Sequence, residues 1–344
     1  MATKYLSATA NWSTAVWWTT SGGSTVTTAP GVGDSADLNG KTLTIDQDIT
    51  CDALIGTTGT LAVSGNRTIN AAVGNTSAGF GCTLNGASQT VTVNGNVQAG
   101  VTTSRFTLNG ATTTLTINGN LTGGAASNIR GVSITNGILN VTGNVTGGSS
   151  TSTSFGIGYG PGTITIVGDV KAATGSGIGY VTAGACSITV TGNVSSTANN
   201  PIPSGILLSN GTPTLVVNGN VTGGNQTVGL TVSTANATAT VNGNVIGSTQ
   251  HANGFGAQIS AGILNINGDV QAASTSTNTI QVTGGTLNLT GSITENSSRT
   301  TINVSGGTFN YTPASDDTAV IGGKTMYPTR GVQPITRQEF TAAA

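Results

Sequence analysis

Short stretches of alternating apolar and polar residues recur along most of the chain, and a glycine-containing turn follows each. Nine clear copies are VTVNGNV (91–97), LTINGNL (115–121), LNVTGNV (139–145), ITIVGDV (164–170), ITVTGNV (188–194), LVVNGNV (215–221), ATVNGNV (239–245), LNINGDV (264–270) and LNLTGSI (287–293). A weaker copy, LAVSGNRTI (61–69), precedes them, and TFNYT (308–312) ends the series. A period of two is typical of β-strands, so the apolar residues, such as Val91, Val93 and Val97, should point inward.

The copies are evenly spaced. From Gly95 to Gly291 the turn glycines recur at a mean interval of about 24.5 residues, and a second short apolar strand, such as GVSIT (131–135), GILLS (205–209) or GLTVS (229–233), precedes each motif. One unit cannot bury its apolar face alone, so successive units must stack. We therefore predict an all-β fold, a right-handed parallel β-helix (β-solenoid) with coils of about 24 residues.

The turn residues predict a ladder along the stack. Glycine permits a positive φ and asparagine tolerates the left-handed region, so both suit a tight turn. Stacked coils should align a column of asparagines: Asn66, Asn96, Asn120, Asn144, Asn193, Asn220 and Asn244. Asp169 and Asp269 take the place of asparagine in two coils. Stacked amide side chains hydrogen-bond in other parallel arrays, so we interpret the column as structural, with a ligand site as the alternative.

The two ends depart from the repeat, which divides the chain into residues 1–60, 61–312 and 313–344. The first segment contains Trp12, Trp17 and Trp18. It is expected to cap the first coil, or to dock a partner, because tryptophan is enriched at interface hot spots. The last segment contains Arg330 and Arg337. It is expected to be either a cap or an anchoring tail.

Composition narrows the classes of function. Charged residues make up 6% of the chain and the net charge is −1, so no basic stripe is available to neutralise nucleic-acid phosphates. There is no apolar run of about 18 residues, so no transmembrane helix is expected. The opening residues lack the apolar stretch of a secretory signal. We therefore expect neither a nucleic-acid nor a membrane partner, and synthesis in the cytoplasm.

Residues suited to catalysis or metal binding are sparse. Asp169 and Asp269 fall in equivalent turns four coils apart, much farther than the roughly 5 to 9.5 Å between glycosidase carboxylates. Glu295 lies past the turn, and His251 has no neighbouring Cys, Asp or Glu in sequence. We predict no catalytic, metal or cofactor site. The three cysteines, Cys51, Cys82 and Cys186, fit no metal-ligand spacing and are expected to be small buried residues, with a disulfide or a reactive thiol as the alternative.

The outward positions of the main strand are uncharged and consist mostly of Thr and Asn. One column is Thr92, Thr116, Asn140, Thr165, Thr189, Val216, Thr240, Asn265, Asn288 and Asn310; the next is Asn94, Asn118, Thr142, Thr191, Asn218, Asn242, Asn267 and Thr290. Such a wall could face water, a sister chain, a glycan or ice. Ice-binding solenoids present T-x-T ranks, and the mixed T-x-N pattern here disfavours that reading.

These features together resemble the solenoid proteins of tailed-phage virions, namely capsid decoration proteins, head fibres and tail fibres. The resemblance rests on the missing signal, the opening NWSTAVWW, the degenerate Gly-Asn repeat and the irregular tail. The segment PGVGDSADLNGKTLTID (30–46) is also similar to the first coil of bacterial surface solenoids. The resemblance implies a non-enzymatic virion protein, a homotrimer, with capsid or tail proteins as partners. The alternatives are a glycan-binding adhesin of a phage tail or bacterial surface, and a polysaccharide-degrading spike.

Overall fold

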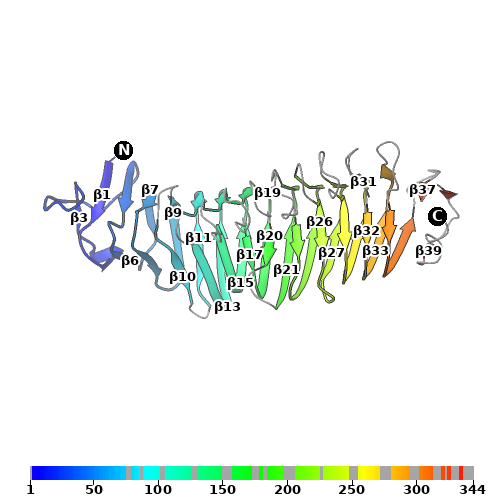
Figure 1. Ribbon diagram of the computed structural model, residues 1–344. Coiled ribbons are helices and arrows are strands. Elements are labelled where there is room, and N and C mark those ends of the chain that lie inside the picture. Colours follow the sequence, from blue (N-terminus) through cyan, green and yellow to red (C-terminus); the bar gives the residue numbers. More distant parts are fainter. Residues whose placement is uncertain are drawn as a thin grey trace. The chain divides into compact units, whose positions relative to one another are not determined.

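Figure 1 shows the computed structural model of the chain, coloured from the N-terminus to the C-terminus. It describes residues 2–74, 79–85, 88–100, 105–124, 130–148, 157–172, 178–180, 184–196, 206–224, 228–247, 255–271, 280–294, 302–312, 319–321, 324–326 and 333–335. The chain forms two compact units, residues 1–168 (unit 1) and 169–344 (unit 2). Apart from one 3₁₀ turn, η1 (Trp12–Thr14), the regular structure of the described residues is β-strand.

Three parallel sheets, which we name walls A, B and C in chain order, form unit 1. Wall A contains β2 (Ala10–Asn11), β6 (Thr42–Ile45), β8 (Thr60–Val63), β10 (Cys82–Leu84), the first parts of β13 (Phe106–Ile117) and β15 (Val132–Val141), and β17 (Ile157–Tyr159). Wall B contains the starts of β7 (Ile49–Ile55) and β9 (Arg67–Val73), β11 (Thr90–Val93), the second parts of β13 and β15, and β18 (Gly162–Ile166). Wall C contains β1 (Ala2–Leu6), β5 (Asp34–Asp37), the ends of β7 and β9, β12 (Val97–Gln98), β14 (Leu121–Thr122) and β16 (Val145–Thr146).

Equivalent residues of successive coils pair directly, and their side chains fill the interior. Leu115 pairs with Val91 on one side and Leu139 on the other, as the parallel arrows of β11, β13 and β15 in Figure 1 suggest. None of these three side chains has any solvent-exposed surface. The same holds for Val97, Leu121 and Val145 after the turn. The inward positions predicted from the alternating pattern are thus confirmed.

The turn glycines are required by close packing between coils. Gly95, Gly119 and Gly143 do not have a positive φ, so the conformational reason expected from the sequence is wrong for them. A Cβ built on Gly119 would lie 2.4 Å from the carbonyl oxygen of Gly95, and one built on Gly143 would lie 2.4 Å from that of Gly119. Real Cβ atoms do not approach an oxygen so closely. Glycine therefore lets each turn lie directly against the turn of the preceding coil.

The coils begin before residue 60, so the predicted cap of residues 1–60 is not a separate region. Wall C already joins β1 to β5 and β5 to β7 in parallel. These first coils are shorter: Leu43 pairs with Leu61, 18 residues further on. Later partners are farther apart in sequence: Val91 pairs with Leu115, 24 residues further on. A search for a period of about 24 residues misses the short coils for this reason.

Asn66 lies in a different turn from the other asparagines of its predicted column. Val91 pairs with Arg67 and Val97 with Val73, so the repeat copy in this coil is RTINAAV (67–73) and not LAVSGNRTI. The residues before Gly65 belong to wall A, whose inward residues alternate with the same period of two. The Gly-Asn turn at 65–66 therefore connects wall A to wall B, whereas the later ones connect wall B to wall C.

Unit 2 repeats the same three-wall arrangement. Wall A contains β20 (Ile178–Tyr180), β23 (Ile206–Leu208), β26 (Leu230–Val232), β29 (Ala257–Ile259), β32 (Ile280–Val282) and β35 (Ile302–Val304). Wall B contains β21 (Ala185–Val190), β24 (Thr212–Val217), β27 (Thr238–Val241), β30 (Ile263–Ile266), β33 (Thr286–Thr290) and β36 (Thr308–Thr312). Wall C contains β19 (Val170–Ala172), β22 (Val194–Ser196), β25 (Val221–Thr222), β28 (Val245–Ile246), β31 (Val270–Gln271) and β34 (Ile293–Thr294). The predicted parallel β-solenoid is confirmed in both units.

The last coil of unit 2 is covered by a strand of opposite direction. β39 (Gln333–Ile335) pairs antiparallel with β36, with Phe309 opposite Ile335 and Asn310 opposite Pro334. β37 (Ala319–Ile321) and β38 (Lys324–Met326) form a separate antiparallel pair. Part of the predicted tail, residues 333–335, thus lies along the end of wall B, as a cap would.

Candidate functional site

Hydrogen bonds from coil to coil join the asparagines of the turn between walls B and C. We call this column the turn ladder. In unit 1, Oδ1 of Asn96 accepts the main-chain N–H of Asn120 at 2.9 Å, and Oδ1 of Asn120 accepts that of Asn144 at 2.9 Å. The sequence interpretation expected bonds between side chains here. The structure mainly shows side-chain oxygens that accept main-chain N–H groups of the next turn. One bond of the expected kind occurs in unit 2, from Nδ2 of Asn193 to Oδ1 of Asp169 at 3.3 Å.

In unit 2 the turn ladder runs from Asp169 through Asn193, Asn220, Asn244 and Asp269 to Ser292. Each side-chain oxygen accepts the main-chain N–H of the next member, at 2.7 to 2.9 Å. Asp169 and Asp269 are therefore four coils apart and engaged in the same bond as asparagine. A carboxylate serves this purpose as well as an amide, because only an acceptor is needed.

A second column, which we call the strand ladder, joins amide side chains to each other beside the turn. In unit 1, Nδ2 of Asn94 donates to Oδ1 of Asn70 at 2.6 Å, and Nδ2 of Asn118 donates to Oδ1 of Asn94 at 2.7 Å. In unit 2, Asn267 donates to Asn242, and Asn242 to Asn218, each at 2.8 Å. The sequence placed these residues on the outward face, but their bonding depends on coil register, which the sequence pattern alone does not fix.

The outward face of wall B in unit 2 is uncharged over all its strands. A third line of amides lies there, with Asn310 donating to Asn288 and Asn288 donating to Asn265, both at 2.7 Å. The other outward residues of these strands are Ala185, Ser187, Thr189, Thr212, Thr214, Val216, Thr238, Thr240, Ile263, Thr286, Thr290, Thr308 and Thr312. The side-chain amides of Asn265, Asn288 and Asn310 are therefore held in place by hydrogen bonds to each other.

The tryptophans of the first coil are mainly structural. β3 (Trp17–Trp18) folds back antiparallel to β1, with Leu6 opposite Trp17, and β4 (Val26–Thr27) pairs with β3. Trp17 has no exposed surface and packs 5.3 Å from the ring of the buried Trp12. Docking through these two residues is therefore excluded by burial. Trp18 is half-buried.

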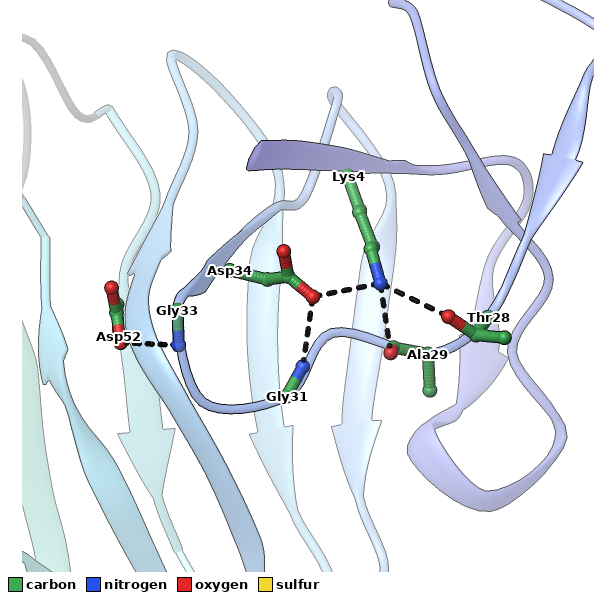
Figure 2. Close-up of polar contacts among 7 residues, drawn as sticks. All are labelled: Lys4, Thr28, Ala29, Gly31, Gly33, Asp34 and Asp52. Atoms are coloured by element: carbon green, nitrogen blue, oxygen red, sulfur yellow. Dashed lines mark hydrogen bonds and ion pairs between the residues drawn. The ribbon is translucent and has the colours of Figure 1, made fainter. Parts of the chain in front are cut away.

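A polar cluster, drawn in Figure 2, fastens the chain as it leaves β4 and re-enters wall C. Nζ of Lys4 lies 2.7 Å from Oδ2 of Asp34 and also donates to Oγ1 of Thr28 and to the carbonyl oxygen of Ala29. The same Asp34 oxygen accepts the main-chain N–H of Gly31. The bond from Lys4 lowers the pKa of Asp34 below its usual value. This cluster closes the loop between the β3–β4 hairpin and the first regular coil.

The other acidic residues of this region also hold turns. Oδ1 of Asp52 accepts the main-chain N–H of Gly33, as Figure 2 shows, and that of Asp37 accepts the N–H of Asn39. Asp48 accepts the N–H of Thr68, the equivalent residue of the next coil, and Asn66 accepts the N–H of its own equivalent, Thr90. Asn66 thus bonds to the next coil at the corner between walls A and B and not in the turn ladder.

Arg105 is a fully buried cation that the sequence did not single out. Its Nε donates to the carbonyl oxygen of Gln98 at 2.8 Å, its Nη1 donates to that of Phe80, and its guanidinium lies 4.2 Å from the Phe80 ring centroid. Burial lowers its pKa to about 10, so it remains charged at neutral pH. Arg105 therefore has a structural role: it donates hydrogen bonds to main-chain carbonyl oxygens at the connection between wall C and wall A.

The three cysteines are free and buried, as the first of the two sequence readings expected. Burial raises the pKa of Cys51, Cys82 and Cys186 to about 12, and the nearby Asp52 carboxylate adds to the effect at Cys51. The thiolate is the reactive form, so these thiols are inert at neutral pH. Arg330 and Arg337, expected at a docking surface, lie outside the described residues, as do His251 and Glu295.

The chain matches no protein-family model, no curated protein and no solved structure. In the part of the chain that the structure describes, no helix is long and apolar enough to cross a membrane. Among the same residues, no three His, Cys, Asp or Glu side chains gather as metal ligands would. The features that bear on a proposal are the ladders, the uncharged outward face of wall B in unit 2 and the polar cluster of the first coil.

Proposed function

We propose that the chain is a non-enzymatic structural protein of a phage virion, where it decorates and stabilises the capsid or forms a fibre. It acts as a homo-oligomer, a trimer, and one of its terminal segments anchors it to capsid or tail proteins. The sequence resemblance suggests the virion. The structure supports the mechanical part of the proposal.

The observation that carries the proposal is the use of the polar side chains. The turn ladder joins successive coils from Asn96 to Asn144 in unit 1 and from Asp169 to Ser292 in unit 2, in addition to the strand pairing. The strand ladder adds bonds between some of the same coils. The two carboxylates of the repeat in unit 2 are members of the turn ladder. A stack in which side chains reinforce successive steps resists bending and local opening, which suits a load-bearing role.

The outward face of wall B supports assembly into oligomers. Covering charged groups carries a desolvation penalty, and the described wall B strands of unit 2 present none. Their Thr and Asn groups can hydrogen-bond across an interface between copies. A trimer closes a rotational symmetry and so avoids open-ended association.

The test is co-purification with particles. A tagged chain is produced in the phage's host, and particles are isolated on a density gradient and imaged by electron microscopy. We expect the tag to sediment with particles and added density at fixed capsid or tail positions. A chain found only in the soluble fraction, or a purified chain that is monomeric by light scattering at micromolar concentration and absent from particles, would contradict the proposal.

A glycan-binding adhesin is the second candidate, favoured by one observation. The amides of Asn265, Asn288 and Asn310 form an ordered row on wall B, and pre-ordered amides can bond sugar hydroxyls at little entropic cost. Binding to a glycan array distinguishes the two candidates. Loss of array binding in Asn288→Ala, with particle incorporation unchanged, would favour the adhesin.

A further inference from the structure

One Asn–Gly pair in unit 2 has a geometry that differs from those in the ladders. Asn210 and Gly211 connect β23 on wall A to β24 on wall B. The main-chain N–H of Gly211 donates to Oδ1 of the preceding Asn210 at 2.8 Å. Because Cγ is bonded to Oδ1, the Gly211 nitrogen also lies close to the Asn210 side-chain carbon, and both residues are partly exposed to water.

The Asn–Gly pairs of the strand ladder are held differently. Nδ2 of Asn242 donates to Asn218 and its Oδ1 accepts from Asn267, so the amide is fixed at both ends between neighbouring coils. To turn toward the nitrogen of Gly243, this side chain would have to break two hydrogen bonds. Asn210 needs no such opening, because its amide already faces the nitrogen that follows it.

We propose that Asn210 is a site of spontaneous succinimide formation and deamidation. The Gly211 nitrogen loses its proton to base and attacks Cγ of Asn210. The N–Cγ bond forms, Nδ2 takes up a proton from water or the protonated base, the Cγ–Nδ2 bond breaks, and Nδ2 leaves as ammonia. Water then adds across one of the two imide C–N bonds. The product is aspartate or isoaspartate at position 210, and the reaction needs no oxidant, reductant or cofactor.

Glycine makes the step feasible, since the attacking nitrogen is not shielded by a side chain. Gly211 has a φ of 74°, which only glycine adopts readily. Its carbonyl oxygen is held by Oγ1 of Thr234 at 3.1 Å, which keeps the turn in place. Modification introduces a negative charge beside an otherwise uncharged wall, and isoaspartate also lengthens the main chain between β23 and β24.

The test follows all Asn–Gly sites of the purified full-length chain in mildly alkaline buffer, by peptide mapping with mass spectrometry and isoaspartate detection. We expect modification at Asn210 at least about tenfold faster than at Asn242 or Asn267, which corresponds to about 1.4 kcal/mol. In urea, where the ladders are lost, the rates should become similar. Asn210→Gln should remove the product at this site, because the ring closed by glutamine is larger.

Two results would overturn the proposal. One is modification at Asn242 or Asn267 as fast as at Asn210 in the folded chain. The other is a folded chain in which Asn210 is modified more slowly than in urea. The ratio of folded to unfolded rates at each site makes the outcome independent of the intrinsic reactivity of its neighbours. Circular dichroism confirms that Asn210→Gln is folded.

Discussion

Oδ1 of Asn120 accepts the main-chain N–H of Asn144, the equivalent residue of the next coil, at 2.9 Å. Asn120→Ala removes the acceptor, so we expect the free energy of unfolding to fall by about 0.5–1.5 kcal/mol. Urea titration followed by circular dichroism measures the change. Asn120→Asp is the matched control, because Asp269 makes the same bond natively. Equal losses in both variants would show that the acceptor is not what matters.

Substitution of Gly119 tests whether the close packing of successive turns requires glycine. A Cβ on Gly119 would lie 2.4 Å from the carbonyl oxygen of Gly95, so Gly119→Ala must push two coils apart. We expect a loss of about 1–3 kcal/mol in the free energy of unfolding. Gly31→Ala is the control, since Gly31 has no atom within 4 Å of its added Cβ. A similar urea midpoint of unfolding for both variants would mean that the turn accommodates the added methyl group without loss of stability.

Substitutions of Trp17 and Trp18 distinguish a role in packing the first coil from a role in docking a partner. Trp17 is fully buried, so Trp17→Ala should cost about 3–5 kcal/mol and lower the midpoint of thermal unfolding. Trp18 is half-buried, so Trp18→Ala should cost less. Should particle incorporation be lost in Trp18→Ala while its unfolding midpoint stays close to that of the parent chain, Trp18 contributes to docking. Unchanged incorporation in Trp18→Ala assigns both rings to the packing of the first coil.

The Lys4–Asp34 ion pair makes the first coil sensitive to acid. The pKa of Asp34 is lowered in the folded chain, so its contribution to stability is present above its ordinary pKa of 3.8 and is lost as the pH falls through the folded pKa. We expect proteolysis of the first coil by an acid protease to increase over that range. Asp34→Asn should abolish this increase. A variant that keeps the same pH dependence would point to another group, such as Asp46, whose pKa is lowered by its bond from Ser13.

The cysteines offer a probe of global opening. Because burial raises the pKa of Cys82 and Cys186 to about 12, a thiol reagent should label neither in the folded chain at neutral pH. Both should be labelled rapidly in urea. Labelling of Cys82 under native conditions would reveal local opening of the first unit, and labelling of Cys186 would do the same for the second.

The alternation of apolar and polar residues identifies the interior side chains, because successive residues of a β-strand point to opposite faces and only one face is buried. Val91 and Leu115 were placed correctly on that basis alone. Asn66 was misplaced because a strand of wall A followed by Gly-Asn has the same local pattern as a strand of wall B followed by Gly-Asn. Only pairing with the next coil distinguishes them.

The contacts that hold the first coil could not be predicted from the sequence. Lys4 and Asp34 are thirty residues apart and meet because β1 pairs in parallel with β5, after the β3–β4 hairpin that lies between them in sequence. The buried Arg105 likewise meets Phe80 and Gln98 through the stacking of coils. Neither relation leaves a periodic signal, because each occurs once in the described chain.

An in-register parallel stack whose last strand is open can template the addition of further chains, as amyloid fibrils do. In unit 2 the final wall B strand meets β39, which runs in the opposite direction and contains Pro334. Because β39 is antiparallel to β36, it interrupts the in-register parallel stack at this wall. The chain thereby combines the side-chain ladders of a self-propagating fibre with a terminus that stops propagation at wall B.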